Sequence, residues 1–305
     1  MAYRILSLDG GGIRGIYTAV LVERLEAAVP SLLSKVDLFA GTSTGGILAL
    51  ALAKGLRPRD IVALYKESGK EIFDDSWWDG LRDLGRLTGA DYSNDELKKI
   101  LRQVFGRTTL GQLGKRVLVP TFDLDNLDRP ARRGQVRTWK AKFFHNFPGP
   151  RSDRGQLAVD VALRTSAAPT YFPAYQGFID GGVVANNPSV AALAQAIDQD
   201  AGKQEVGDVR ILSLGTGFNP SFIQGQDLDW GIAQWGRPLV NIMIEGVMNV
   251  GDYQCRQFLG RHYHRLNPML PKPVALDDAG KTGDLIKYAK AVKISSTVAW
   301  IRENF

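Results

Sequence analysis

The stretch FAGTSTGGILALALAKG, residues 39–55, decides how this chain of 305 residues folds. It begins with apolar residues typical of a buried strand, turns at Gly41–Gly46, and continues as a helix rich in alanine and leucine. Gly-x-Ser-x-Gly between a strand and a helix exposes a nucleophilic serine on a sharp turn. The candidate nucleophile is Ser43. A serine hydroxyl needs a neighbour that takes its proton, so another part of the chain has to supply a base.

Strand-like and helix-like segments alternate on both sides of this stretch. We expect strands at 3–8, 35–40, 116–122, 135–144 and 209–214, a strand that ends at 178–179, and helices at 16–29, 47–54, 58–72, 93–105, 156–167 and 285–300. Such alternation predicts an α/β fold with a mostly parallel sheet that helices cover on both faces.

A second glycine-rich turn, DGGGIRG at 9–15, follows the first expected strand and opens the first expected helix. Its spacing also fits the G-x-G-x-x-G fingerprint of dinucleotide-binding proteins. That fingerprint requires an acidic residue at the end of the next strand, to hold a ribose hydroxyl. Here the acidic residue, Asp37, stands at the beginning of that strand. The nucleotide interpretation is therefore disfavoured.

The same turn suits an oxyanion hole. Three successive glycines, Gly10, Gly11 and Gly12, leave backbone N–H groups unobstructed beside a helix N-terminus, where a developing negative charge is stabilised. Arg14 could hold this loop or contact an anionic head group. Both glycine turns follow parallel strands, and sites in α/β proteins form at that edge of the sheet. We therefore expect the glycine amides to lie close to Ser43.

A carboxylate is available later in the chain. Asp180 follows the strand-like Gly177–Ile179 and precedes two glycines, so its side chain could approach another loop closely. An Asp-Gly pair also marks an ordinary turn.

Together these segments resemble the patatin-like phospholipase family. The resemblance rests on DGGGIRG at 9–15, GTSTGG at 41–46, SAAPTYFP at 166–173, DGGVVANNP at 180–188 and LSLGTG at 212–217. Order and spacing agree over residues 1–217, whereas residues 218–305 carry no motif that we can place. The resemblance implies one patatin-like domain over residues 1–305, with a three-layer α/β/α fold around a mostly parallel sheet.

The resemblance also implies hydrolysis of fatty-acyl esters by a Ser–Asp dyad. In that scheme Ser43 is the nucleophile, Asp180 is the base, and the oxyanion hole consists of Gly10, Gly11 and Gly12 with Arg14 nearby. A free aspartate has a pKa of about 3.9 and is a feeble base. Burial near an apolar lipid pocket would raise the pKa of Asp180 and so make it a better acceptor for the serine proton.

Two other interpretations stay open. An ordinary α/β-hydrolase would combine Ser43 with a later acid and with His262 or His264, in the chain order Ser, Asp, His. Against it, Ser43 follows a single strand–helix unit, and HYHRLNP at 262–268 does not resemble a catalytic-histidine loop. A non-catalytic module would instead use the glycine loops to bind a nucleotide or a lipid.

Composition limits the setting in which the protein works. The single cysteine, Cys255, excludes an internal disulfide and favours a reducing compartment. The N-terminus lacks the pattern of a signal peptide, and no apolar run approaches the ~20 residues that span a bilayer. We expect a cytoplasmic protein that associates peripherally with membranes. No calcium loop, zinc cluster or cofactor motif is apparent, so we expect neither a metal nor a cofactor.

Charge and family together suggest partners. The net charge of +6 and the pI of about 9.3 are typical of a solvated surface with a modest cationic excess, and they also allow attraction to an anionic surface. Basic residues gather at 129–142, but no nucleic-acid-binding motif accompanies them, so a nucleic-acid polymer is disfavoured. The resemblance implies membrane phospholipids as substrates. Some bacterial members of the family are effectors that nucleotide second messengers activate in antiphage defence, so a cyclic nucleotide activator is a further expectation.

One further segment, SWWDGLRDLGRL at 76–87, has tryptophans and leucines at near-helical spacing with arginines between them. It could be a peripheral helix packed on the core. Its two glycines weaken a structural helix, and tryptophan beside arginine suits a membrane interface. We expect it to cover the site and to dock on anionic bilayers.

Overall fold

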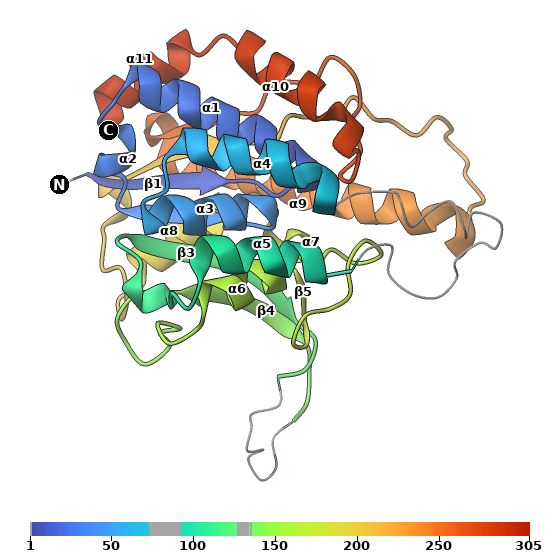
Figure 1. The fold of residues 1–305 in the computed structure, drawn as a ribbon, viewed down its shortest axis with the longest axis horizontal. Helices are drawn as coiled ribbons and strands as arrows, with labels where there is room; N and C mark the ends of the chain where they lie inside the picture. Colours follow the sequence, from blue (N-terminus) through green and yellow to red (C-terminus); the bar gives the residue numbers. More distant parts are fainter. Residues whose placement is uncertain (1, 73–92, 127–133, 135) are drawn as a thin grey trace.

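A computed structural model describes residues 2–72, 93–126, 134 and 136–305 (Figure 1). A seven-stranded sheet runs through the middle of the molecule, and its strands follow the order β4-β3-β2-β1-β6-β7, with β5 beside β3. The strands are β1 (Tyr3–Leu8), β2 (Leu38–Gly41), β3 (Arg116–Asp123), β4 (Lys140–His145), β5 (Phe178–Asp180), β6 (Val209–Leu214) and β7 (Tyr263–Leu266).

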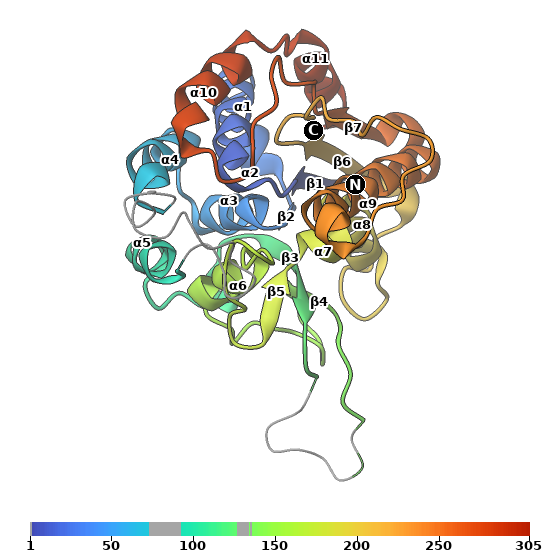
Figure 2. The same ribbon diagram turned by 90° about the vertical axis from the view of Figure 1, so that its right-hand side faces the viewer.

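Helices cover both faces of this sheet, which confirms the predicted three-layer α/β/α fold (Figures 1 and 2). The α-helices of the described residues are α1 (Gly15–Ala28), α2 (Leu32–Lys35), α3 (Thr44–Lys54), α4 (Pro58–Ile72), α5 (Asp95–Phe105), α6 (Ala158–Thr165), α7 (Gly182–Ala185), α8 (Ser189–Ile197), α9 (Ile232–Leu259), α10 (Thr282–Ala291) and α11 (Ser295–Asn304). Short 3₁₀ turns precede α1, at Gly12–Arg14, and follow α9, at Gly260–His262.

Alternation along the central strand divides the core into two layers. In β1 the side chains of Leu6 and Leu8 pack with α1, α3 and α10, whereas Ile5 packs with α8 and α9 on the opposite face. All three side chains are fully buried. Successive side chains of a strand point to opposite faces, so a strand that is covered on both sides is largely apolar.

The parallel part of the sheet runs from β3 through β2, β1 and β6 to β7. β4 and β5 are antiparallel to β3. The predicted mostly parallel sheet is thus confirmed. Since β1, β2 and β6 end at the same edge, the loops after them lie together, and these loops carry both glycine turns.

The C-terminal part of the chain differs from the prediction. The single helix expected at 285–300 is in fact α10 and α11, because Val292 adopts an extended conformation and ends α10. The long helix α9 and the strand β7 had no counterpart in the sequence analysis. β7 pairs with β6 and completes one side of the sheet, so residues after 217 are part of the central sheet and its layers.

Candidate active site

Ser43 lies on a strained turn between β2 and α3. It is the N-cap residue of α3, with φ 54° and ψ −125°, a backbone conformation that a residue with a side chain rarely adopts. The turn is also too tight for side chains at its glycines: a Cβ on Gly41 would lie 2.0 Å from the Gly45 carbonyl oxygen. These features place the Ser43 hydroxyl at the start of a helix, above the end of the sheet.

Two buried threonines hold this turn in place. The Ser43 amide donates to Thr165 Oγ1 at 2.9 Å, and that hydroxyl donates to the Pro120 carbonyl at 2.6 Å. Thr42 Oγ1 donates to the Ala185 carbonyl at 2.6 Å. The supporting role of these two threonines is not recognisable from the sequence, because a hydroxyl that bonds a distant backbone atom carries no local pattern.

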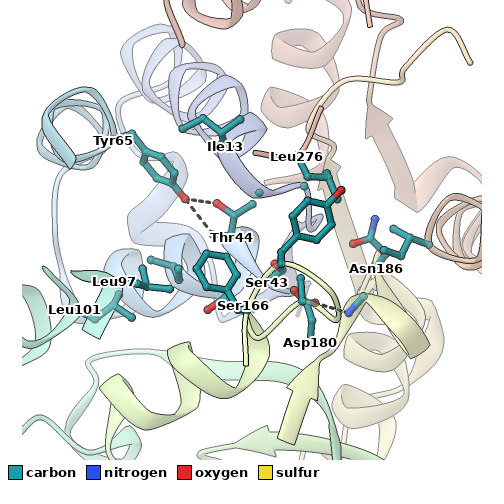
Figure 3. A pocket seen from close by; sticks show the side chains of 18 of the residues that line it. Ile13, Ser43, Thr44, Tyr65, Leu97, Leu101, Ser166, Asp180, Asn186 and Leu276 are labelled. Atoms are coloured by element: carbon teal, nitrogen blue, oxygen red, sulfur yellow. Dashed lines mark hydrogen bonds between the residues drawn. The ribbon is translucent and has the colours of Figure 1, made fainter. Parts of the chain in front are cut away.

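Asp180 reaches the turn from a strand that runs the other way. Along β3, pairing with β2 extends to Leu118, and pairing with β5 begins at Thr121. β4 pairs with the other edge of β3 over 118–123. β5 therefore pairs with the same edge as β2, beyond the point where β2 ends. Asp180 is the last residue of β5 and is opposite Thr121. This arrangement brings its carboxylate beside Ser43 (Figure 3).

Burial dominates the electrostatics of this carboxylate. Asp180 is only 6% exposed, and burial raises its pKa to about 6, although hydrogen bonds from the Ser43 side chain and the Gly182 amide act in the opposite direction. The Gly182 N–H donates to Asp180 Oδ1 at 2.7 Å. A carboxylate with a raised pKa beside a serine hydroxyl can accept a proton near neutral pH.

Two glycines of the loop after β1 border the cavity that holds Ser43. Gly11 and Gly12 line it together with Ser43. The Gly10 amide, in contrast, donates to the Asn186 carbonyl at 3.1 Å. The structure therefore contradicts the predicted role of Gly10 as an oxyanion donor. Its lack of a side chain matters instead, since a Cβ there would lie 2.2 Å from Asn186 Oδ1.

Arg14 does not line this cavity in the described structure. Its side chain is buried, and its Nη1 donates to the Gly217 carbonyl at 3.4 Å. Of the roles considered for Arg14, support of the loop fits this geometry, whereas direct participation in the oxyanion hole does not.

A buried ion pair ties the glycine loop to the C-terminal part of the chain. Asp9, the first residue of the loop, pairs with Arg265 of β7, with 2.5 Å between Asp9 Oδ2 and Arg265 Nη2. Arg265 Nη1 also donates to Ser213 Oγ at 2.7 Å. Leu276 contributes as well, because its carbonyl accepts the Ile13 amide at 2.8 Å. Residues after 217 thus fix the position of the loop.

Apolar side chains form most of the wall of the cavity around Ser43 and Asp180. They come from seven separate parts of the chain: Ile13, Ile47, Leu64, Leu97, Ile100, Leu101, Phe172, Ile244 and Leu276. A mostly apolar cavity with a few polar groups at one point is the usual form of a site for an organic ligand. This wall suits a fatty-acyl chain whose ester group lies at Ser43.

The histidines that a Ser-His-Asp triad would need lie elsewhere. His264 Nε2 is 2.9 Å from Thr297 Oγ1, and its ring stacks on Trp300 of α11. His262 precedes β7, at the opposite edge of the sheet from Ser43. His145 is in β4 and also does not line the cavity. The structure therefore brings none of the three histidines to Ser43, which counts against the α/β-hydrolase alternative.

The expected lid at 76–87 lies outside the described residues, as do residues 129–133 and 135 of the basic segment at 129–142.

Comparison with known proteins agrees with this geometry. The family model described as patatin-like phospholipase matches residues 6–193. A cGAMP-activated phospholipase of Pseudomonas aeruginosa is 35% identical over 278 residues, which cover 87% of this chain and 78% of that protein. Protein teg of Priestia megaterium is 30% identical, with 99% of both chains covered. The putative sporulation hydrolase CotR of Bacillus subtilis is 31% identical, with 99% of this chain and 98% of that protein covered. The chain belongs to the patatin-like phospholipase family.

Proposed function

We propose that the protein hydrolyses fatty-acyl esters of membrane phospholipids, with Ser43 as the nucleophile and Asp180 as the base. The observation that carries this proposal is the buried Asp180 carboxylate, with its pKa of about 6, beside Ser43 in an apolar cavity. An ordinary surface aspartate would lack the basicity that the reaction requires.

The proposed reaction has two steps. Asp180 takes the Ser43 proton as the hydroxyl oxygen attacks the ester carbonyl, and the amides of Gly11 and Gly12 stabilise the oxyanion. The alcohol leaves with that proton, and an acyl-enzyme remains. Asp180 then takes a proton from water, which attacks the acyl-enzyme and releases the fatty acid while Ser43 regains its hydrogen. The positive end of α3 also favours negative charge at Ser43.

We propose, in addition, that residues 1–305 form a single catalytic domain. Ile244 and Leu276 complete the wall of the cavity, and Arg265 holds Asp9. Since Ile244, Arg265 and Leu276 all follow residue 217, the part of the chain without recognised motifs would be needed for an intact site.

This mechanism predicts an acid limb in the pH profile. Asp180 must be ionised to accept a proton, and its pKa lies at about 6. Activity should therefore be full above this value and fall as the pH decreases through it, by about tenfold per pH unit well below it. Measuring kcat/KM for an uncharged short ester from pH 4.5 to 8 checks this. Circular dichroism over the same range controls for unfolding, and a limb centred near pH 4 would contradict the assignment.

The substrate has to be extracted from a bilayer, and α9 offers a surface for contact with it. The N-terminal part of α9 projects past the ends of the strands (Figure 1). Leu239, Ile242 and Met243 are exposed there by 45%, 46% and 51%, while the next residue, Ile244, lines the cavity. We infer that this apolar face inserts into the membrane surface beside the mouth of the cavity. Among the described helices, none has both the length and the apolar character needed to cross a bilayer.

Replacing Ile242 and Met243 by glutamine should therefore affect membrane substrates selectively. The substitutions remove the free energy gained when two apolar side chains move from water into the membrane. The rate on phospholipid vesicles should therefore fall by about tenfold or more. The rate on a short soluble ester should stay unchanged. Phe258→Gln is the matched control, because Phe258 is 57% exposed at the far end of the same helix. Equal losses on both substrates would assign these residues to the cavity wall instead.

Regulation by a cyclic nucleotide remains a proposal that rests on relatives alone. Relatives named cGAMP-activated phospholipase include the Pseudomonas aeruginosa protein and one from Vibrio cholerae that is 33% identical. If this chain is regulated in the same way, phospholipid turnover should be low alone and should rise with one member of a panel of cyclic nucleotides. Full turnover without any of them would argue against such control.

A further inference from the structure

A second cavity lies at the opposite edge of the sheet from Ser43. It has a volume of about 360 Å³ and is bounded by the beginnings of β1 and β6, the end of α2, the turn after α9 and the end of α11. Five basic side chains line it: Arg4, Lys35, Arg210, Arg261 and Arg302. Glu303 is the one acidic side chain among the lining residues that the structure describes.

The basic side chains of this cavity have no paired carboxylate within the described structure, although some have backbone partners, and Arg210 Nη1, for example, donates to the Gly207 and Val209 carbonyls at 2.7 and 3.1 Å. None of the five basic side chains has a carboxylate oxygen within 4.0 Å among the described residues. Asp37 lies close by but accepts the Arg4 backbone amide, at 2.8 Å, and not its guanidinium. Arg4 Nε is buried without a hydrogen-bond partner. Cations gathered in one concavity without a paired carboxylate create a positive potential.

Neighbouring titratable groups respond to this potential. Burial lowers the pKa of Arg210, and the charges of Arg261 and Arg4 lower it further, while Asp208 acts in the opposite direction. Burial also lowers the pKa of His262, again with contributions from Arg210 and Arg261. Like charges therefore repel one another here, and a bound anion would relieve that repulsion.

We propose that this cavity binds a small soluble anion that carries phosphate groups, held by Arg4, Arg210 and Arg302. The guanidinium group presents a planar set of donors that matches phosphate oxygens, and Lys35 adds a point charge. The ligand is soluble and not a lipid head group because the cavity faces away from Ser43. β1 runs from one edge of the sheet to the other over six residues, or about 20 Å. A bilayer at the mouth of the active site would not reach this far edge.

The ligand would join segments that are far apart in the sequence. Arg4 belongs to β1, Arg210 to β6 and Arg302 to α11. Binding should therefore stabilise the folded chain as a whole, because only the folded state brings these three side chains together.

Calorimetric titration of the Ser43→Ala protein with pyrophosphate tests this proposal without any contribution from hydrolysis. We expect saturable binding that weakens with salt, and a raised melting temperature relative to sodium chloride of equal ionic strength. Arg210→Gln/Arg302→Gln should weaken binding about tenfold or more, since each change removes charge-assisted hydrogen bonds. Arg107→Gln, which removes an exposed arginine outside this cavity, should leave binding unchanged. Lys35→Gln changes an exposed residue of the cavity and is therefore less prone to disturb the fold. We expect it to weaken pyrophosphate binding less than the double variant does.

Vesicles of phosphatidylglycerol distinguish a soluble ligand from a lipid head group. The Arg210→Gln/Arg302→Gln protein should bind these vesicles as well as its parent does. The proposal is overturned if pyrophosphate binds no better than chloride, if the double variant binds it as tightly as the parent, or if the double variant loses vesicle binding. The result does not depend on the proposed hydrolysis, because every protein in the titration lacks Ser43.

Discussion

Ser43→Ala and Asp180→Asn should each reduce phospholipid turnover on the order of 10⁴-fold or more, while the protein stays folded. The first change removes the attacking oxygen, and the second removes the carboxylate that takes its proton. Losses of this size are typical when one member of a catalytic unit is deleted. Both substitutions keep the local packing nearly unchanged, because they remove one atom or exchange one for a similar atom.

The double variant separates a shared role from two independent ones. If Asp180 acts only through Ser43, removing both should cost scarcely more than removing either alone. Independent contributions would instead multiply. Lipid-product analysis by mass spectrometry, with thermal melting of each variant, measures both quantities.

Matched substitutions outside the site control for nonspecific effects. Ser34→Ala changes an exposed serine of α2, and Asp160→Asn changes a carboxylate of α6 that bonds the Tyr175 hydroxyl at 2.9 Å. Both should retain turnover close to that of the parent. Substantial turnover by folded Asp180→Asn would refute the proposed dyad and would require another base near Ser43.

The second large effect concerns stability. Arg265→Met should lower the free energy of unfolding by about 3–5 kcal/mol, because it leaves the Asp9 carboxylate buried without its partner. Asp9 has an exposed fraction of 0%, and the Arg265 side chain one of 6%. Water can therefore replace little of the lost interaction. Chemical denaturation followed by tryptophan fluorescence measures this difference.

Neutralising the stranded acid provides the control. Asp9→Asn/Arg265→Met should be less destabilised than Arg265→Met alone, because no unpaired charge remains buried. Turnover by the folded double variant then tests whether the Asp9–Arg265 pair also positions Gly11 and Gly12. Reduced turnover would indicate that it does. If Arg265→Met lowers the free energy of unfolding by less than about 1 kcal/mol, the Asp9–Arg265 pair contributes no more than a solvent-exposed ion pair does.

Local patterns in the sequence were sufficient to predict the sheet, its covering helices and the turn at Ser43. Alternating apolar segments predicted the mostly parallel sheet and its covering helices, because side-chain periodicity follows directly from backbone geometry. The glycine spacing around Ser43 predicted the tight turn, which the structure confirms with a positive φ of 54° at that residue. The roles of Ser43 and Asp180 in catalysis came from the family resemblance and remain predictions for the assays above.

Tertiary structure decided which glycines of the first loop line the cavity. In the sequence, Gly10, Gly11 and Gly12 are equivalent, yet the Gly10 amide donates to the Asn186 carbonyl, whereas Gly11 and Gly12 line the cavity. Similarly, Thr165 supports the Ser43 amide across 122 residues. A hydrogen bond between segments so far apart depends on how the strands are ordered, and no pattern within either segment encodes it.

The C-terminal part of the chain shows most clearly the difference between what local sequence patterns predict and what only the tertiary structure decides. Residues 218–305 carry no recognised motif, but Arg265 pairs with Asp9 across 256 residues and Leu276 closes the cavity. The sequence by itself determined the fold class and the segments that carry the candidate nucleophile, base and glycine loop, because local spacing sets strands, helices and turns. Only the tertiary structure decided the hydrogen bond that engages the Gly10 amide, the burial that raises the pKa of Asp180, and the buried partner of Asp9, because such contacts join distant segments.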